Sequence, residues 1–410
     1  MKDFFITILA WKIKKLAQLT IWRYRPGIVG VTGSVGKTST KMAIAAVLGA
    51  ERRVRFSKGN FNNELGLPLT ILGDWDDIKG VFFWPKVICV AITNLIVKRE
   101  YPEILILEYA IQRPGDMKYL LGIARPNISV ITAIGEIPAH VEFFGSPEEV
   151  AREKGRLIEY LPSTGFAVLN RDDATVTAIQ SKTRAHLMTF GFSREAEVRI
   201  TNFENRSHDD CPLGIGFKLQ YAGSFVPVTL NGVFGKAQAY SAAAAAAVGL
   251  IFGLNLVKIS EALKSYRVTG GRMELVPGVK YTYIINDSYN ASPLSMHAAL
   301  DTLKSLPAKR RIAVLGDMLE IGAYSLEAHQ FIGEVAADIV DILVTVGSRA
   351  KFIAEGAKEK GMAKKNILTF DLAEEAQRPL QALIKKGDII LIKGSRAMEL
   401  EKVVEEIRAF

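Results

Sequence analysis

Residues 28–40 read Ile28-Val29-Gly30-Val31-Thr32-Gly33-Ser34-Val35-Gly36-Lys37-Thr38-Ser39-Thr40. A β-branched run leads into a loop punctuated by glycine, and the last residues can begin a helix. Strand, glycine-rich loop and helix in this order form a phosphate-binding site, because glycines let backbone N–H groups close around phosphate oxygens and the helix N-terminus adds its positive end. The stretch therefore predicts a P-loop that binds ATP.

Individual residues of this loop have predicted roles. We expect Lys37 to reach the β and γ phosphates and the Thr38 hydroxyl to ligate Mg²⁺. The residues expected to contact the nucleotide are Gly33, Ser34, Val35, Gly36, Lys37, Thr38 and Ser39. The general spacing of the motif has a glycine where this chain has Val31, so the loop is of the T-G-x-x-G-K-T type.

The sequence around the loop predicts an α/β protein. Short aliphatic runs at 28–32, 104–107 and 128–132 alternate with longer helical stretches, as in a parallel sheet covered by helices on both faces. Residues 186–232 differ, because alternating segments at 198–203, 216–220 and 225–230 predict antiparallel strands appended to that sheet. An alanine-rich helix is expected at Ala237–Ile251.

The domain organisation follows from a break at Thr269-Gly270-Gly271-Arg272, where paired glycines relax the backbone and predict a hinge. After it the βα alternation restarts, with strands expected at 312–315, 342–346 and 389–392. We expect a basic apolar helix at residues 1–26, a central P-loop ATPase domain at 27–268 and a Rossmann-like C-terminal α/β domain at 269–410.

Composition excludes several classes of protein. With 410 residues, 49% of them hydrophobic and 23% charged, the chain is neither fibrous nor disordered. The formal net charge is +9, and residues 1–26 carry six basic residues against one acidic residue. The remainder is only mildly basic, so we expect no nucleic-acid partner. Two cysteines, Cys89 and Cys211, are too few for a disulfide framework, and we expect a monomer in a reducing cytoplasm.

The N-terminal segment leaves two interpretations open. Its apolar run, Phe4 to Trp11, is far shorter than the roughly 20 residues that span a bilayer, and Lys12, Lys14 and Lys15 stand where a signal peptide has its cleavage site. A helix here has an apolar stripe (Phe5, Ile6, Leu9, Ile13 and Leu16), with Phe4, Ile8 and Trp11 outside it. The helix either packs on the protein or a partner, or lies in the inner face of an anionic membrane.

Beyond the loop, six blocks in order along the chain resemble the Mur ligases, ATP-dependent amide-bond-forming enzymes of peptidoglycan synthesis. The blocks are GNFNNELGLP at 59–68, ILEY at 106–109, AHVEFFGS at 139–146 with Lys154 fourteen residues after His140, NDSYNASP at 286–293, LGDMLEIG at 315–322 and KGSR at 393–396. They are most similar to the branch of the family that adds D-alanyl-D-alanine. The resemblance covers the chain from about residue 27 to its C-terminus.

The resemblance implies roles for particular residues. It implies Lys37, His140 and Lys154 as catalytic residues, and Thr38, Glu108, His140 and a CO₂-carbamylated Lys154 as ligands of Mg²⁺ and a second cation. Asn62 and Asn63 are implied to contact the cell-wall precursor peptide, and Arg272, Asp287 and Asn290 to approach the nucleotide as the domains close. Lys393, Ser395 and Arg396 follow a predicted strand end, where α/β folds bind ligands, and are candidates for the carboxylate of an incoming dipeptide.

Several of these assignments have a structural alternative. Lys154 could be an ordinary surface lysine on a helix over 148–160, and His140 a satisfied structural histidine. Asn62 and Asn63 could be turn residues, and the segment 393–396 a structural loop. Glu108 is the clearest functional candidate, because a carboxylate that closes a hydrophobic strand is costly to bury without a cation.

Two departures from the family pattern leave the substrate open. The family usually has a separate N-terminal domain that helps to hold a UDP-sugar, whereas about 26 residues precede the ATP-binding strand here. Ala237, Gln238 and Ser241 also stand where the family commonly has His, Asn and Asn, so adenine-side contacts are expected to differ. The leading hypothesis is a ligase that adds D-alanyl-D-alanine to a precursor peptide. The alternatives are a sister ligase using another amine and a non-UDP acceptor, and a non-catalytic nucleotide-binding module.

Overall fold

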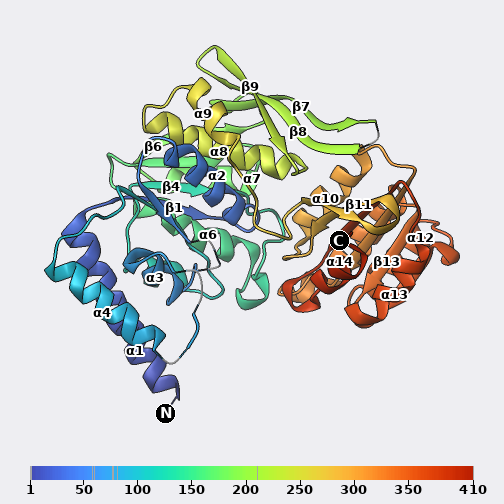
Figure 1. Ribbon diagram of the computed structural model, residues 1–410, viewed down its shortest axis with the longest axis horizontal. Helices are drawn as coiled ribbons and strands as arrows, with labels where there is room; N and C mark the ends of the chain where they lie inside the picture. The colour runs from blue at the N-terminus through green and yellow to red at the C-terminus, as the bar shows by residue number, and fades with distance from the viewer. Residues whose placement is uncertain are drawn as a thin grey trace.

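The computed structural model describes residues 2–57, 59, 61–75, 78–80, 82–209 and 211–409, with side chains from residue 7 onward. The chain forms two lobes, each built on one β-sheet (Figure 1). Asn60 of the block at 59–68 lies outside the described residues, as do the side chains of Phe4, Phe5 and Ile6.

The first lobe contains a nine-stranded sheet of order β2-β3-β1-β4-β5-β6-β7-β8-β9. Its strands are β1 (Gly27–Thr32), β2 (Val54–Phe56), β3 (Ile104–Glu108), β4 (Ile128–Ile131), β5 (Phe166–Asn170), β6 (His186–Gly191), β7 (Val198–His208), β8 (Cys211–Tyr221) and β9 (Ser224–Asn231). Strands β2 to β7 pair in parallel, and β8 and β9 are antiparallel. The predicted mixed sheet is confirmed, except that antiparallel pairing begins at the contact of β7 with β8 rather than at residue 186.

Helices cover both faces of this sheet, which explains why its parallel strands are continuous apolar runs. The helices of this lobe are α2 (Lys37–Gly49), α3 (Gly66–Leu72), α4 (Phe83–Ile96), α5 (Asp116–Leu121), α6 (Pro147–Glu159), α7 (Ala174–Ala178), α8 (Lys236–Ile251) and α9 (Leu256–Leu263). Val29 and Val31 of β1 pack with α2, α8 and α9, whereas Ile28 packs with α3, α4 and α5 on the opposite face (Figure 1). The alternation places the P-loop strand at the centre of the lobe.

The second lobe contains a six-stranded sheet of order β10-β11-β15-β12-β13-β14, in which only β10 is antiparallel to its neighbour. Its strands are β10 (Glu274–Gly278), β11 (Thr282–Asp287), β12 (Arg310–Gly316), β13 (Ile342–Val346), β14 (Ile367–Phe370) and β15 (Asp388–Lys393). Helices α10 (Pro293–Ser305), α11 (Ser325–Ala337) and α12 (Lys351–Glu359) cover one face, and α13 (Ala373–Leu383) and α14 (Glu401–Ile407) cover the other. The strand β15 returns between β11 and β12, so the segment after it reaches the centre of the sheet.

The N-terminal segment is the helix α1 (Lys2–Tyr24), which packs against α3 and α4 at the outer edge of the first lobe (Figure 1). Ile13 and Ala17 are fully buried, whereas Trp11 and Trp22 are 59% and 70% exposed. Packing on the body of the protein is therefore confirmed for one side of α1, while its other side carries large exposed apolar groups. None of the described helices is long and apolar enough to cross a membrane.

Candidate active site

A cavity of 1380 Å³ gathers most of the predicted site residues at one place between the lobes. The P-loop, the ends of β3 and β11, the start of α8 and the segment after β15 all contribute to its wall. The predicted residues that line it are Ser34, Val35, Gly36, Lys37, Thr38, Ser39, Asn62, Asn63, Glu108, His140, Arg272, Asp287, Asn290, Lys393, Ser395 and Arg396. Gly33 and Lys154 lie behind this wall rather than in it.

The backbone of the P-loop requires its glycines. Gly33 has a φ of 150°, and a Cβ atom there would lie 2.0 Å from Thr132 Oγ1. Gly36 precedes α2 in the left-handed region with a φ of 85°, where a side chain is strained. Lys37 donates from Nζ to the carbonyls of Gly33 at 2.8 Å and Ser34 at 3.2 Å, so its ammonium lies over the loop. Burial lowers the pKa of Lys37 despite the nearby Glu108 carboxylate.

Glu108 is the centre of the polar contacts beneath the loop and is only 2% exposed. Thr38 Oγ1 donates to its Oε2 at 3.0 Å, and Asn62 Nδ2 donates to its Oε1 at 3.0 Å. Burial alone would raise the pKa of Glu108, but Lys41 and Lys37 hold it below its ordinary value. A hydroxyl and an ionised carboxylate held together at a phosphate loop fit Mg²⁺.

Lys41 is a site residue that the sequence analysis missed. It lies one turn after Lys37 on α2, is fully buried, and places Nζ 3.2 Å from Glu108 Oε2. It also donates to Ser57 Oγ at 2.9 Å, and burial lowers its pKa. Its position three residues after Thr38, immediately before the apolar run 42–48 of α2, was the available signal.

His140 connects the two lobes. Its backbone is left-handed, with a φ of 70°, and its Nδ1 lies 2.6 Å from Oε2 of Glu320. The hydrogen bond with His140 lowers the pKa of Glu320, which belongs to the block at 315–322 but received no role from the sequence. Within the described residues, no group of three or more His, Cys, Asp or Glu side chains could hold a metal by itself. A cation here would depend on hydroxyl or ligand oxygens as well.

Lys154 lies on α6 and is 1% exposed, so the alternative of an ordinary surface lysine is wrong. No carboxylate in the described part of the chain pairs with it. Burial, followed by repulsion from Lys37, lowers the pKa of Lys154 well below its ordinary value. Its amine therefore lies near the ammonium of Lys37 and strongly prefers the neutral form.

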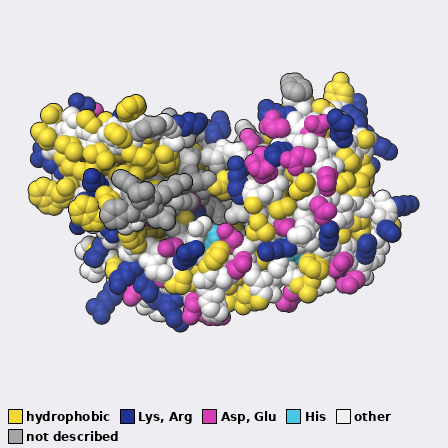
Figure 2. Space-filling model, turned by 90° about the horizontal axis from the view of Figure 1, so that it is seen from below, with side chains coloured by type: hydrophobic (Ala, Val, Ile, Leu, Met, Phe, Trp, Pro, Cys, Tyr) yellow, Lys and Arg dark blue, Asp and Glu magenta, His cyan; other side chains and the backbone are white. Residues whose placement is uncertain are grey.

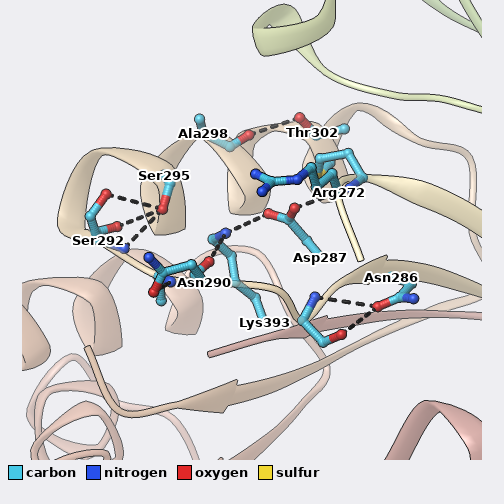
Figure 3. A network of polar contacts seen from close by, with 12 residues as sticks. Arg272, Asn286, Asp287, Asn290, Ser292, Ser295, Ala298, Thr302 and Lys393 are labelled. Atoms are coloured by element: carbon cyan, nitrogen blue, oxygen red, sulfur yellow. Dashed lines mark hydrogen bonds and ion pairs between the residues drawn. The ribbon is translucent and has the colours of Figure 1, made fainter. Parts of the chain in front are cut away.

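In the second lobe, the ends of β11 and β15 form the network drawn in Figure 3. Lys393 Nζ lies 2.5 Å from Asp287 Oδ2 and donates to the Asn290 carbonyl at 2.9 Å. Asp287 Oδ1 also accepts from the Met273 backbone at 3.0 Å, and burial raises the pKa of its carboxyl despite Lys393. Lys393 and Asp287, expected to serve different ligands, are therefore one ion pair, and any ligand carboxylate at Lys393 has to share the ammonium with Asp287.

Arginine side chains gather around Tyr289, a second residue that the sequence analysis missed. The Arg272 guanidinium lies 3.9 Å from the centre of the Tyr289 ring, and the Arg396 guanidinium lies 5.8 Å from it. Ser395 is 2% exposed, like Lys393, and its Oγ accepts from the Leu319 backbone at 2.9 Å. Ser395 therefore helps to fix the loop at Leu319. Arg396 lies on the cavity wall and pairs with Glu401, whose Oε1 is 3.1 Å from Arg396 Nη1.

The departures at the start of α8 have structural roles. Gln238 is 2% exposed, donates from Nε2 to the Arg272 carbonyl at 3.2 Å and accepts from the Tyr266 hydroxyl at 2.6 Å. Ser241 Oγ lies 3.2 Å from Thr40 Oγ1 on α2. Gln238 therefore fixes the backbone of the predicted hinge, and Ser241 ties α8 to the helix that follows the P-loop.

Comparisons with known proteins find family likeness over most of the chain. The sequence model described as Mur ligase middle domain matches residues 31–83 and 85–249, and the one described as Mur ligase, glutamate ligase domain matches residues 271–396. The UDP-N-acetylmuramoyl-tripeptide–D-alanyl-D-alanine ligases of Bacillus subtilis and Escherichia coli are 32% and 30% identical to the chain. The alignments cover 96% and 93% of this chain, and 79% and 76% of the respective relatives.

Solved structures give the same result. MurF ligase from Thermotoga maritima, solved in complex with ADP, is 27% identical with a TM-score of 0.78, over 97% of this chain and 83% of that one. Folylpolyglutamate synthase of Mycobacterium tuberculosis, solved with ADP and AMPPCP, shares the fold alone, at 17% identity and a TM-score of 0.66, over 97% of this chain and 96% of that one.

Proposed function

The chain belongs to the Mur ligase family, and on that premise we propose that it uses ATP to join D-alanyl-D-alanine to the peptide of a UDP-N-acetylmuramoyl-tripeptide precursor. The observation that supports this most directly is the single cavity shared by the P-loop, Glu108, Asn62 and Asn63 of the first lobe and Arg272 and Arg396 of the second. Such a cavity brings a nucleotide, a carboxylate and an amine together. At 1380 Å³ it exceeds the roughly 300–1,000 Å³ of a site for one small ligand.

The chemistry starts from the poor reactivity of a free carboxylate toward an amine. A carboxylate oxygen of the acceptor attacks the γ-phosphorus of ATP, the bond to the β-phosphate oxygen breaks, and ADP leaves. The dipeptide amine then attacks the acyl phosphate carbon, phosphate leaves, and the amine loses a proton. Lys37 stabilises the charge on the transferred phosphoryl group, which is the main requirement of phosphoryl transfer. Thr38 and Glu108 would hold Mg²⁺, which neutralises further phosphate charge.

Lys154 supports a more specific proposal, that its amine carries a carbamate. A neutral amine attacks CO₂ and loses a proton, which leaves an anionic carbamate, and the burial of Lys154 favours that neutral form. As an ammonium, Lys154 would repel both Lys37 and a bound cation. As a carbamate it would attract both, with His140 as a further ligand of the second cation.

We also propose that the hinge lies at the boundary between residues 268 and 269, with domains at 27–268 and 269–410. Gly271 has a φ of 75°, which glycine adopts freely, and Met273 has a φ of 56°, which is strained for a residue with a side chain, where the lobes join. Closure of the lobes about this segment would bring Arg272, Asp287 and Asn290 toward the nucleotide and exclude water from the acyl phosphate.

The outer side of α1 supports peripheral contact with the inner face of a membrane. Figure 2 shows a broad hydrophobic area on the lobe that carries α1 and α4. We call the exposed side chains Trp11, Leu19 and Trp22 of α1 and Ile92 and Ile96 of α4 the α1/α4 face. Exposed Lys12, Lys15 and Arg23 lie on the same helix, and this charge favours an anionic bilayer as the occupant.

The test of the ligase is incubation with ATP, Mg²⁺, the UDP-linked tripeptide and D-alanyl-D-alanine, followed by mass spectrometry of the product. Phosphate release that requires both acceptor and amine supports the proposal. Product only with another amine or a UDP-free acceptor would favour the sister ligase. Binding of ATP without product from any pair would favour a non-catalytic module.

A further inference from the structure

One face of α1 belongs to the same cavity as the P-loop. Thr7, Ala10, Trp11, Lys14 and Lys15 line that cavity. Their spacing of three and four residues places them along one side of a helix. The helix is therefore a wall of the proposed active site as well as an outer edge of the lobe.

The position of α1 is fixed by contacts at both sides of this stretch. Gln18 Nε2 donates to the Gly122 carbonyl at 2.6 Å, beside the end of α5. Near its C-terminus, the Tyr24 hydroxyl donates to the Asn94 carbonyl at 2.7 Å, and its ring stacks on Tyr101 with centroids 4.5 Å apart. Ile13 is fully buried on the opposite side. The cavity-lining face is thus held in one orientation.

This end of the cavity is rich in positive charge. Lys14, Lys15 and Arg113 line it, and none of the three has an ion-pair partner among the described residues. Lys14 Nζ lies 3.9 Å from the centre of the Tyr119 ring, which holds the ammonium at the wall. Burial, and then repulsion from Lys15, lowers the pKa of Lys14.

Two carboxylates share this end, but one is already engaged. Asp116 Oδ2 accepts from the backbone N–H groups of Gln112 and Arg113, both at 2.8 Å. Glu64 is the other acidic side chain of the wall here. Three cations therefore face two carboxylates at this end of the cavity, and the excess of positive charge favours an anionic ligand.

We propose that Lys14 and Lys15 of α1, together with Arg113, bind the diphosphate group of the acceptor. This inference rests on the proposed function, because it identifies the acceptor as a diphosphate-linked molecule whose peptide reaches Asn62, Glu108 and Lys37 along the same cavity. Trp11 lies one turn before the two lysines and offers its ring to whatever the diphosphate carries. Two sources share this chemistry: a nucleoside diphosphate, with a base on Trp11, and a prenyl diphosphate, with its chain on the α1/α4 face.

The test is direct binding of two probes, UDP and geranylgeranyl diphosphate, to the full chain by isothermal titration calorimetry, with MgADP saturating the P-loop. The variant Lys14→Ala/Lys15→Ala should weaken the diphosphate that binds by about tenfold or more, since each lost hydrogen bond to a charged group costs this order of affinity. Lys364→Ala/Lys365→Ala removes two adjacent exposed lysines from the other lobe and should leave binding unchanged. The single variant Lys15→Glu, at an exposed position, repeats the test without disturbing the packing of Lys14 on Tyr119.

The outcomes separate this site from the ligase activity. Tight binding of UDP alone identifies a nucleotide-linked acceptor, and tight binding of the prenyl diphosphate alone identifies a lipid-linked one. Failure of both probes to bind the wild type, or equal binding by the wild type and the Lys14/Lys15 variant, would overturn the inference even if the enzyme turns over. Lysine-dependent binding with no turnover from any acceptor would refute the proposed function and leave the diphosphate site standing.

Discussion

Lys41→Met is the substitution that most sharply tests the electrostatics beneath the P-loop. Lys41 is fully buried, Glu108 is 2% exposed, and the atoms that pair are 3.2 Å apart. Removing one partner of a buried ion pair costs about 3–5 kcal/mol, because the other charge is left in a medium that solvates it poorly. We expect a loss of this size in the free energy of unfolding of the first lobe at pH 7.

The stability lost in Lys41→Met should depend on pH through the protonation of Glu108. In the wild type the folded-state pKa of Glu108 is lowered, so its contribution to stability is present above the unfolded pKa and is lost as pH falls through the folded pKa. Without Lys41, the largest interaction that opposes burial is lost, so the pKa of Glu108 rises. The deficit of Lys41→Met should therefore shrink toward acid pH, where Glu108 takes up a proton, and grow toward neutral pH.

Urea unfolding followed by tryptophan fluorescence measures this lobe selectively, because all of the chain's tryptophans lie in it. They are Trp11, Trp22, Trp75 and Trp84. The double variant Lys41→Met/Glu108→Gln should recover much of the stability that Lys41→Met loses. The matched control is Lys258→Met, which breaks the exposed ion pair with Glu51 and should cost less than about 1 kcal/mol. Equal costs for the buried and exposed pairs, or additive single and double variants, would refute the reasoning.

Three further predictions concern the site and the outer helix. Lys37→Ala should lower turnover by about a thousandfold, because the transferred phosphoryl group loses stabilisation. The control Lys236→Ala, at the start of α8, should keep the turnover of the wild type. Comparable phosphate release by Lys37→Ala and the wild type would remove the P-loop from the mechanism. Lys154→Ala should lose about a hundredfold in turnover, and added acetate should partly restore it by supplying the missing anion. The control is Lys118→Ala, whose turnover acetate should not raise. Unchanged turnover in Lys154→Ala, or an acetate effect no larger than that on Lys118→Ala, would exclude the carbamate. Leu19→Ser/Trp22→Ser should reduce flotation of the protein with anionic phosphatidylglycerol vesicles by about tenfold or more, whereas Leu326→Ser on the second lobe should not; flotation that is absent in the wild type would eliminate membrane contact.

The strands and the P-loop were predictable because their signals are local. Strand β13 begins and ends at the predicted residues, Ile342 and Val346, since a short aliphatic run in a parallel sheet is buried on both faces. The loop was predictable for a similar reason, because Gly33 and Gly36 occupy backbone conformations that other residues adopt only with strain.

The charges around the loop were less predictable because they depend on distant pairing. Glu108 meets Lys41 only through the register that places Val31 beside Glu108 and through the phase of α2. The role of α1 as a cavity wall depends likewise on its packing against α3 and α4. Neither contact can be read from a short window of sequence, because the position of Lys41 before an apolar run marks the residue but not its partner.

The arrangement of buried charge shows why this site requires anions. Lys37 and Lys41 share one carboxylate, Glu108, and Lys154 lies near Lys37 without a carboxylate partner in the described part of the chain. Burial lowers the pKa of all three lysines. The protein thus holds more positive charge than its own groups neutralise, and the triphosphate of ATP is the ligand that balances it. A carbamate on Lys154 would reverse the sign of its interaction with Lys37, from repulsion that disfavours both ammonium groups to attraction that keeps Lys37 protonated for phosphoryl transfer. A carbamylated Lys154 would therefore affect catalysis through the charge state of Lys37, although Lys154 does not line the cavity.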